Sequence, residues 1–276
     1  MKKRRKKKSH FWKYFGKTLF FIIKIPYYLV MGIIYLIKGI IKLSKKRAVK
    51  SQENKIKKKR ESIKAKYTPF KIIETISGDY KNWFDKTIDS DSQIGIILGA
   101  RGSGKTGIGV KMLENIYSRH KEKCFAIGFK PNEFPSWIKV VLDISELEND
   151  SWVLIDEGGI LFNSRSSMSN ANKLLSQLIL VARHKNINIL FISQNSSNLD
   201  INILRQADFL ILKKSSLLQR DFERKIIQKI YLGSKDKFEK YGNDKGLAYI
   251  YSEKFMGFVS NALPSFWKEG ISKSFK

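Results

Sequence analysis

A glycine-rich loop between a predicted strand and a predicted helix is the feature that most constrains the fold. The run SQIGIILGARGSGKTGIGVKMLENIYSRH, residues 92–120, begins with β-branched residues and continues with apolar residues at helical spacing. The loop fits G-x-x-x-x-G-K-[ST], with Gly99, Gly104, Lys105 and Thr106 at the fixed positions. In such a loop the backbone N–H groups turn toward phosphates, and the helix N-terminus adds its positive end. The stretch therefore predicts a phosphate-binding loop and not a chance glycine turn.

The residues of this loop are expected to contact a nucleotide. The nucleotide-contacting residues are predicted to be Gly99, Ala100, Arg101, Gly102, Ser103, Gly104, Lys105 and Thr106. The ammonium of Lys105 is expected to reach the β- and γ-phosphates, and the hydroxyl of Thr106 is expected to bind Mg²⁺. ATP and Mg²⁺ are the predicted cofactors.

Two carboxylates end a second apolar strand. The run SWVLIDEGG, residues 151–159, places Asp156 and Glu157 where a parallel sheet would form its ligand crevice. Asp156 fits the role of organising Mg²⁺, and Glu157 fits the base that polarises the attacking water. An adjacent Asp-Glu pair alone indicates only a solvated strand end. Its place after the glycine loop, with a β-α-β pattern between them, favours the functional interpretation.

A third apolar strand, NILFIS, ends just before Gln194. The carboxamide of Gln194 is expected to hydrogen-bond the lytic water and the γ-phosphate, with an ordinary strand-end cap as the alternative. Arg183 ends the preceding helix and is expected to reach a neighbouring subunit's nucleotide as an arginine finger. The alternative for Arg183 is a helix C-cap that complements the helix dipole. The adjacent His184 is interpreted as a polar surface residue.

The alternation of strands and helices predicts an α/β fold with a mostly parallel sheet. Strands are predicted near residues 94–98, 123–129, 138–142, 152–156, 188–193, 208–213 and 247–251. Helices are predicted near residues 104–119, 170–184 and 216–231. The Ser/Asn-rich segment 163–172, which contains Arg165, is predicted to be a solvated loop, with contact to DNA or a neighbouring subunit as the alternative.

The first quarter of the chain carries most of its charge. In a chain of net charge +28, residues 1–66 hold 23 of the 53 Lys and Arg residues and two of the 25 Asp and Glu residues. Inside this basic region lies an apolar tract at residues 11–43. Between Thr18 and Ile37 its only charged residue is Lys24, so the tract is long enough to span a bilayer.

This tract predicts membrane attachment and leaves its geometry open. On a helix its lysines fall on one stripe, which suits a helix lying in the headgroup plane of the membrane; they are Lys13, Lys17, Lys24, Lys38, Lys42 and Lys45. A single span with Lys24 snorkelling, or a soluble amphipathic helix packed on the domain, are the other interpretations. Basic flanks favour the cytoplasm, and the lone cysteine, Cys124, suits a reducing compartment and is predicted to be buried.

Three segments of the chain together resemble the FtsK/HerA lineage of P-loop motors, and more narrowly the zonular occludens toxin family, which includes assembly ATPases of filamentous phages. They are GARGSGKT, LIDEGGILFNSR and ARHKNINILFISQNSSNLDINILRQADFLILKK, with LPSFW near the end of the chain. Ile201, Ile203 and Arg205 approximate a further element of that family. The resemblance implies an additional strand between the two strands that carry the Walker motifs, a ring-forming ATPase, and a membrane-bound secretion or extrusion role.

We therefore expect a basic tail (1–10), a membrane helix (11–43), a basic linker (44–69), a P-loop ATPase domain (70–267) and a tail (268–276). The expected function is an ATP hydrolase, its ATPase domain in the cytosol, that drives assembly or export of a DNA-containing particle. The expected partners are a membrane, further copies of the chain, DNA and phage or viral assembly proteins. The alternatives are an FtsK/HerA-type DNA-translocating, conjugation or packaging ATPase, and a membrane-bound ATP switch that moves no polymer.

Overall fold

The computed structural model describes residues 9–158 and 168–272, and the chain divides into two compact units, residues 1–58 and 59–276. The described part of the first unit belongs to one helix, α1 (Ser9–Ser62), whose last four residues are counted with the second unit. Among the residues that the structure describes, no helix is long and apolar enough to cross a membrane. The basic residues 1–8, the side chains of Lys13, Lys17 and Lys24, and residues 159–167 around Arg165 lie outside the description.

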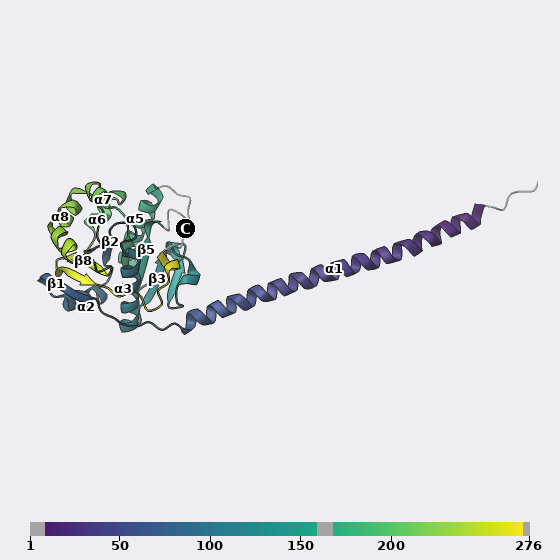
Figure 1. The fold of residues 1–276 in the computed structure, drawn as a ribbon, viewed down its shortest axis with the longest axis horizontal. Helices are drawn as coiled ribbons and strands as arrows, with labels where there is room; N and C mark the ends of the chain where they lie inside the picture. Colours follow the sequence, from purple (N-terminus) through teal and green to yellow (C-terminus); the bar gives the residue numbers. More distant parts are fainter. Residues whose placement is uncertain (1–8, 159–167, 273–276) are drawn as a thin grey trace, which may run out of the picture. The chain divides into compact units, whose positions relative to one another are not determined.

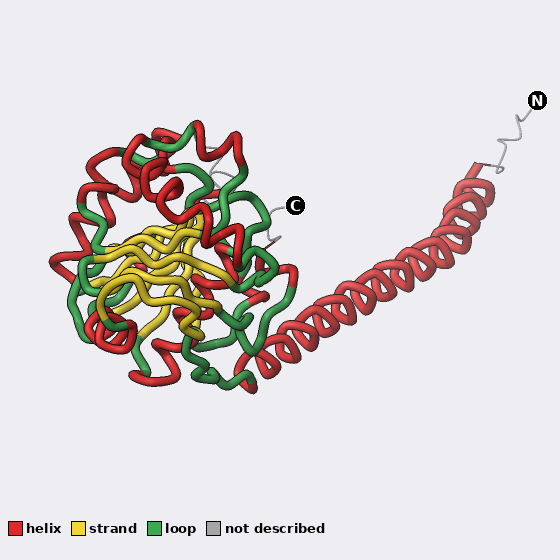
Figure 2. Tube along the Cα trace, turned by 60° about the vertical axis from the view of Figure 1, so that its left-hand side comes forward, coloured by secondary structure: helices red, strands yellow, loops and turns green. Residues whose placement is uncertain are grey.

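The described part of residues 59–276 contains one nine-stranded sheet, in the order β1-β9-β8-β7-β2-β6-β5-β3-β4 (Figures 1 and 2). The strands are β1 (Lys71–Gly78), β2 (Ile94–Leu98), β3 (Lys123–Ile127), β4 (Ile138–Val141), β5 (Ser151–Asp156), β6 (Ile187–Ile192), β7 (Phe209–Leu212), β8 (Leu247–Ser252) and β9 (Phe255–Ser260). The six strands from β7 to β4 are parallel, and β8, β9 and β1 extend the sheet in antiparallel fashion. Because β6 lies between β2 and β5, the predicted additional strand between the two Walker strands is confirmed.

Helices cover both faces of this sheet, as Figure 2 shows with the strands in yellow and the helices in red. They are α2 (Tyr80–Ile88), α3 (Lys105–His120), α5 (Met168–Lys185), α6 (Ile201–Arg205), α7 (Leu217–Asp221), α8 (Lys225–Lys240) and α9 (Glu269–Ser272), with short 3₁₀ turns at Pro131–Glu133, Ile144–Glu146 and Ser196–Asn198. All residues of the central strands β2 and β6 are buried, as expected for parallel strands covered on both sides.

Alternate residues of these strands enter two separate cores. Ile97 of β2 packs into the core that contains Ile108 of α3, whereas its neighbour Ile96 packs into the core that contains Leu178 of α5. The buried Cys124 on β3 belongs to the first of these cores, as predicted. Because alternate side chains of β2 enter opposite cores, both faces of the strand that precedes the glycine loop are packed in the interior of the domain.

The helix predicted at 216–231 is interrupted in the structure, which has two helices there. Helix α7 ends at Asp221 and α8 begins at Lys225. Between them Glu223 turns inward and is only 4% exposed. Its carboxylate accepts hydrogen bonds from the backbone N–H of Ser196, at 2.6 Å, and from the Ser196 hydroxyl. The residue between the two helices thus serves as a buried acceptor for the loop that follows β6.

Polar side chains on α3 bind the segment that follows α1. Glu114 accepts hydrogen bonds from the backbone N–H groups of Lys66 and Ser265, both at 3.0 Å, and from the buried ammonium of Lys111 at 2.8 Å. Asn115 pairs with the backbone of Thr68 in both directions, at 2.9 and 2.8 Å.

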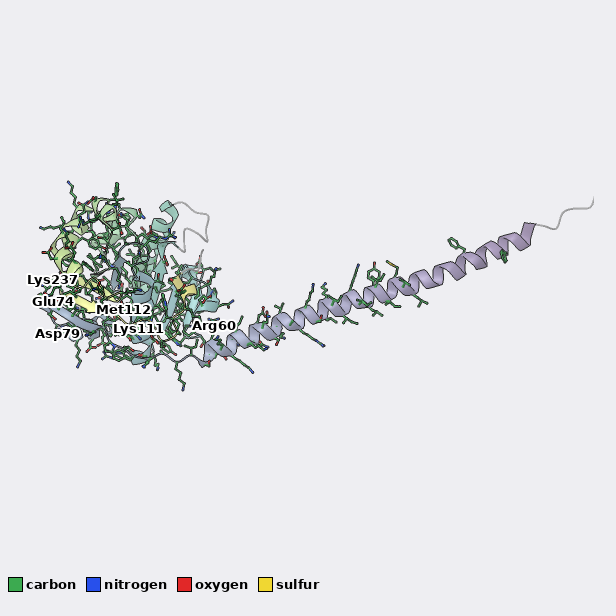
Figure 3. The ribbon with its side chains drawn as sticks, viewed as in Figure 1. Arg60, Glu74, Asp79, Lys111, Met112 and Lys237 are labelled. Carbon is green, nitrogen blue, oxygen red and sulfur yellow. The ribbon has the colours of Figure 1, made fainter. Side chains whose placement is uncertain are left out.

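Nearby side chains extend this attachment. The guanidinium of Arg60 donates to the carbonyl of Phe134 at 2.7 Å, and the indole of Trp137 donates to the carbonyl of Ile63 at 3.2 Å. Figure 3 labels Arg60 on this segment and Lys111 on α3. Residues 60–68, which we name the strap, are thus hydrogen-bonded along their length to α3 and to the segment around Phe134 and Trp137.

Candidate nucleotide site

Four neighbouring parallel strands end at the same edge of the sheet. The glycine loop follows β2, Asp156 ends β5 with Glu157 next, and Ser193 and Gln194 follow β6. Lys213 follows β7 on the other side of β2. Since the carboxyl ends of parallel strands form the ligand crevice of an α/β sheet, the predicted site residues of these segments are brought to one edge.

The glycine loop has the backbone that a phosphate cradle requires. Gly102 and Gly104 have φ angles of 76° and 93°, in the left-handed region that glycine adopts without steric cost. Gly104 is the N-cap of α3, so Lys105 and Thr106 form the first turn of that helix. The loop therefore presents its N–H groups beside the positive end of α3.

Lys105 is directed into this loop. Its ammonium donates to the carbonyls of Gly99, at 2.7 Å, and Ala100, at 2.9 Å. Burial lowers the pKa of Lys105 to about 8, and the nearby charges of Asp156, Glu157 and Glu223 oppose that shift. The ammonium thus lies among the loop carbonyls, within the loop that would surround the phosphates.

The site fits ATP and Mg²⁺ on two further observations. The buried hydroxyl of Ser103, inside the loop, has no hydrogen-bond partner among the described residues, and a phosphate oxygen would supply one. Thr106 is half-buried at the start of α3 and Asp156 is half-buried at the end of β5, one hydroxyl and one carboxylate. Mg²⁺ bound with a nucleotide uses such a small protein donor set, because phosphates and waters complete its octahedron.

Glu157 is the most enclosed carboxylate of the predicted set. It is 5% exposed, and its carboxylate accepts a hydrogen bond from the Ser193 hydroxyl at 2.5 Å. Burial raises the pKa of Glu157, while hydrogen bonds from Ser193, the Gln194 backbone and the Asn198 side chain oppose the shift. A raised pKa suits a general base, since a carboxylate accepts a proton more readily when its pKa lies closer to the pH at which the protein works.

The contact to Ser193 was not predicted. The sequence signal was the position of Ser193 between an apolar strand and Gln194. That position did not indicate Glu157, 36 residues earlier in the chain, as the partner of the hydroxyl. Ser193 now joins the site, because it fixes the carboxylate that is expected to act on water.

The loop after β6 is also bonded to α7. The side chain of Gln194 is exposed, and its backbone carbonyl accepts a hydrogen bond from the carboxamide of Gln219. The same carboxamide of Gln219 donates to Glu223 at 3.1 Å. Gln194 therefore lies at the predicted edge of the sheet with its side chain exposed to solvent. Its backbone is hydrogen-bonded to α7, a helix that the sequence did not connect with the site.

Arg183 is not brought to the nucleotide site of its own chain. It is exposed in the last turn of α5, as is His184, and α5 leads into the amino end of β6. The glycine loop lies at the carboxyl end of the neighbouring strand. The predicted role of Arg183 therefore requires a second subunit, and it stays a prediction.

Residues 109–214 match the family model described as zonular occludens toxin (Zot). This segment is Zot-like. The Zot-like segment runs from α3 to the end of β7 and includes Asp156, Glu157, Arg183 and Gln194. With the P-loop that precedes this segment, the chain is a P-loop NTPase and an ATP hydrolase. No curated protein sequence matches this chain.

Solved structures with similarity to this chain include the following three. The genome packaging NTPase B204 from Sulfolobus turreted icosahedral virus 2, in complex with ATP-gammaS, is 14% identical with a TM-score of 0.44, over 62% of this chain and 98% of that one. The pCW3 conjugation coupling protein TcpA is 12% identical with a TM-score of 0.45, over 67% and 62%. EssC (ATPases 2 and 3) from Geobacillus thermodenitrificans is 11% identical with a TM-score of 0.43, over 78% and 49%.

Proposed function

We propose that this chain is a membrane-attached ATPase motor that forms a ring and drives the assembly or export of a DNA-containing particle. The observation that carries the proposal is the meeting of the P-loop, the Asp156–Glu157 pair and the Gln194 loop at one sheet edge of a chain with a Zot-like segment. In this proposal the site binds a nucleotide, and a movement of the loop that contacts Glu157 would reach α7, because the same loop is bonded to that helix.

The residues of the site divide the work of phosphoryl transfer. Bound Mg²⁺ would neutralise phosphate charge, with Thr106 and Asp156 as its protein ligands. Lys105 orients the terminal phosphates by its charge. Glu157 accepts the proton of the attacking water, and Ser193 holds its carboxylate in place.

Arg183 provides a direct test of the ring. If Arg183 completes the site of a neighbouring subunit, full-length Lys105→Ala and Arg183→Ala proteins should each be nearly inactive alone. When they are mixed, an intact P-loop meets an intact Arg183 at about a quarter of the sites in a randomly assembled head-to-tail ring. We therefore expect ATPase activity, measured as phosphate release, to reappear on mixing.

The same variants give a clear negative result. If Arg183 only caps α5, the Arg183→Ala protein should instead keep its activity when tested alone, and that result would remove Arg183 as the residue that completes a neighbouring site. Addition of double-stranded DNA to the wild-type protein distinguishes the two possible substrates of the motor, DNA and coat protein. Stimulation of ATPase activity favours a DNA-translocating motor, whose polymer the basic linker would attract, and no stimulation favours a motor that acts on coat protein.

Apolar side chains all round α1 support membrane attachment. Five consecutive residues, Ile33 to Ile37, are apolar and exposed, and at 100° per residue they point in every direction around the helix. Leu36 and Tyr35 are 68% and 67% exposed. A helix that packs on a domain has one apolar face, whereas an apolar surface on all sides requires lipid or another apolar cover.

Extraction from membranes tests this part of the proposal. The full-length protein, expressed in cells, should sediment with membranes. A spanning α1 resists alkaline carbonate and high salt and exposes residues 1–8 to protease on the far side. A surface helix instead loosens in high salt or when Lys38, Lys42 and Lys45 become Glu, because its attraction to anionic lipid is partly Coulombic. Recovery of the unaltered protein in the soluble fraction would contradict membrane attachment in both forms.

A further inference from the structure

A second lysine lies buried behind the P-loop, on the side away from β5, the strand that ends in Asp156. Lys213 follows β7, the neighbour of the P-loop strand β2, and its backbone N–H donates to the carbonyl of Leu98 at 2.8 Å. The residue is 1% exposed. Nothing in the roles assigned to Lys105, Thr106, Asp156 and Glu157 uses this side chain.

The side chain of Lys213 extends from the first glycine of the P-loop to the last. A Cβ placed on Gly99 would come 2.7 Å from the Cβ of Lys213. A Cβ placed on Gly104 would come 3.4 Å from its Cε and 3.6 Å from its Nζ. The lysine therefore fills the space that the glycines leave empty, and its ammonium lies next to the residue that caps α3.

The charge of this ammonium is poorly compensated by the protein. Nζ donates to the carbonyl of Lys245 at 3.1 Å and lies 3.5 Å from Oδ1 of Asn261, both uncharged acceptors. No carboxylate of the described residues lies within ion-pair distance of it. Burial lowers the pKa of Lys213 to about 8, and the charge of Asp244 opposes that shift. A buried cation without a close anion is unfavourable unless a negative charge approaches it.

The phosphates of a nucleotide would bring that negative charge. We infer that Lys213 is a positioning residue of the nucleotide site, whose buried ammonium stabilises bound phosphate through the P-loop backbone without touching it. The inference rests on the proposed ATP site, and it names the Lys213 ammonium as one source of the affinity of that site for ATP. It predicts that the contribution of Lys213 grows with the number of phosphate charges, because the interaction is Coulombic.

Titration calorimetry of the full-length protein in detergent, with ATP, ADP and AMP in low salt and EDTA, tests this inference. We expect Lys213→Met to weaken ATP binding about tenfold, to weaken ADP binding less and to leave AMP binding nearly unchanged. Lys213→Gln keeps an N–H donor and loses the charge, so it should resemble Lys213→Met. The control is Lys214→Met, which removes the charge of the adjacent exposed lysine and should bind all three nucleotides as the wild type does.

Thermal unfolding without nucleotide adds a readout that a structural role would not give. Removal of an uncompensated buried charge should leave the melting temperature of Lys213→Met unchanged or higher, while the increase in melting temperature on adding ATP becomes smaller. Two results would overturn the inference while ATP binding by the wild type stands. One is wild-type affinity in Lys213→Gln; the other is an equal loss for ATP, ADP and AMP together with a lower melting temperature. A wild-type protein that binds no ATP would instead remove the proposed function.

Discussion

Glu157→Gln is expected to bind ATP as tightly as the wild type and to hydrolyse it about a thousandfold more slowly, within the range that a general base contributes. Glutamine has nearly the same shape and accepts the hydrogen bond of Ser193 through its carbonyl oxygen. It has no proton affinity comparable to that of the carboxylate, whose pKa burial has raised. Phosphate release under saturating ATP measures the loss, and equilibrium binding of ATP measures the retained affinity.

A matched variant separates this effect from a general loss of acidic charge. Glu148 is half-exposed and pairs with Lys123 at 3.1 Å on the surface, so Glu148→Gln should retain wild-type turnover. Full turnover by Glu157→Gln would show that another residue accepts the proton of water.

Lys105→Ala should lose about 100-fold in ATP affinity, because the charge-assisted hydrogen bonds of one ammonium contribute about 1.5–3 kcal/mol. The ammonium of Lys105 lies on the carbonyls of Gly99 and Ala100, inside the loop that would hold the phosphates. The measurement is fluorescence or calorimetric titration with ATP, and hydrolysis should fall with occupancy.

The control for this variant is Lys235→Ala, which removes an exposed lysine that pairs with Glu239 on α8. It should leave ATP affinity unchanged. If Lys105→Ala binds ATP with near wild-type affinity, the glycine loop is not a nucleotide site and the assignment of its eight residues is wrong.

The central sheet could be predicted because each of its strands is short, apolar and close to a motif. Strand β2 occupies the predicted residues, and β3 to β8 lie within a few residues of their predicted positions. The outer part of the sheet was missed. Strand β1 is mostly exposed and pairs with β9, which is nearly 200 residues away in the chain. The local pattern of apolar residues therefore did not indicate this pairing.

The site could be predicted in its positions and not in its contacts. The ends of parallel strands meet by topology, so the P-loop, Asp156 and Gln194 follow from the order of elements. The bonds of Glu157 to Ser193 and of Gln219 to the Gln194 loop depend on side-chain geometry between segments that are distant in sequence. Lys213 was missed for the same reason, since a lysine after a strand usually indicates only the start of a solvated loop.

The strap gives α3 two attachments at different points along its length. The first turn of α3 forms the end of the P-loop, and about two turns later Glu114 and Asn115 hold the backbone of Lys66 and Thr68. The same helix therefore carries both attachments, the P-loop at its first turn and the strap farther along. A shift of α3 that accompanies phosphate binding would displace residues 66–68 as well.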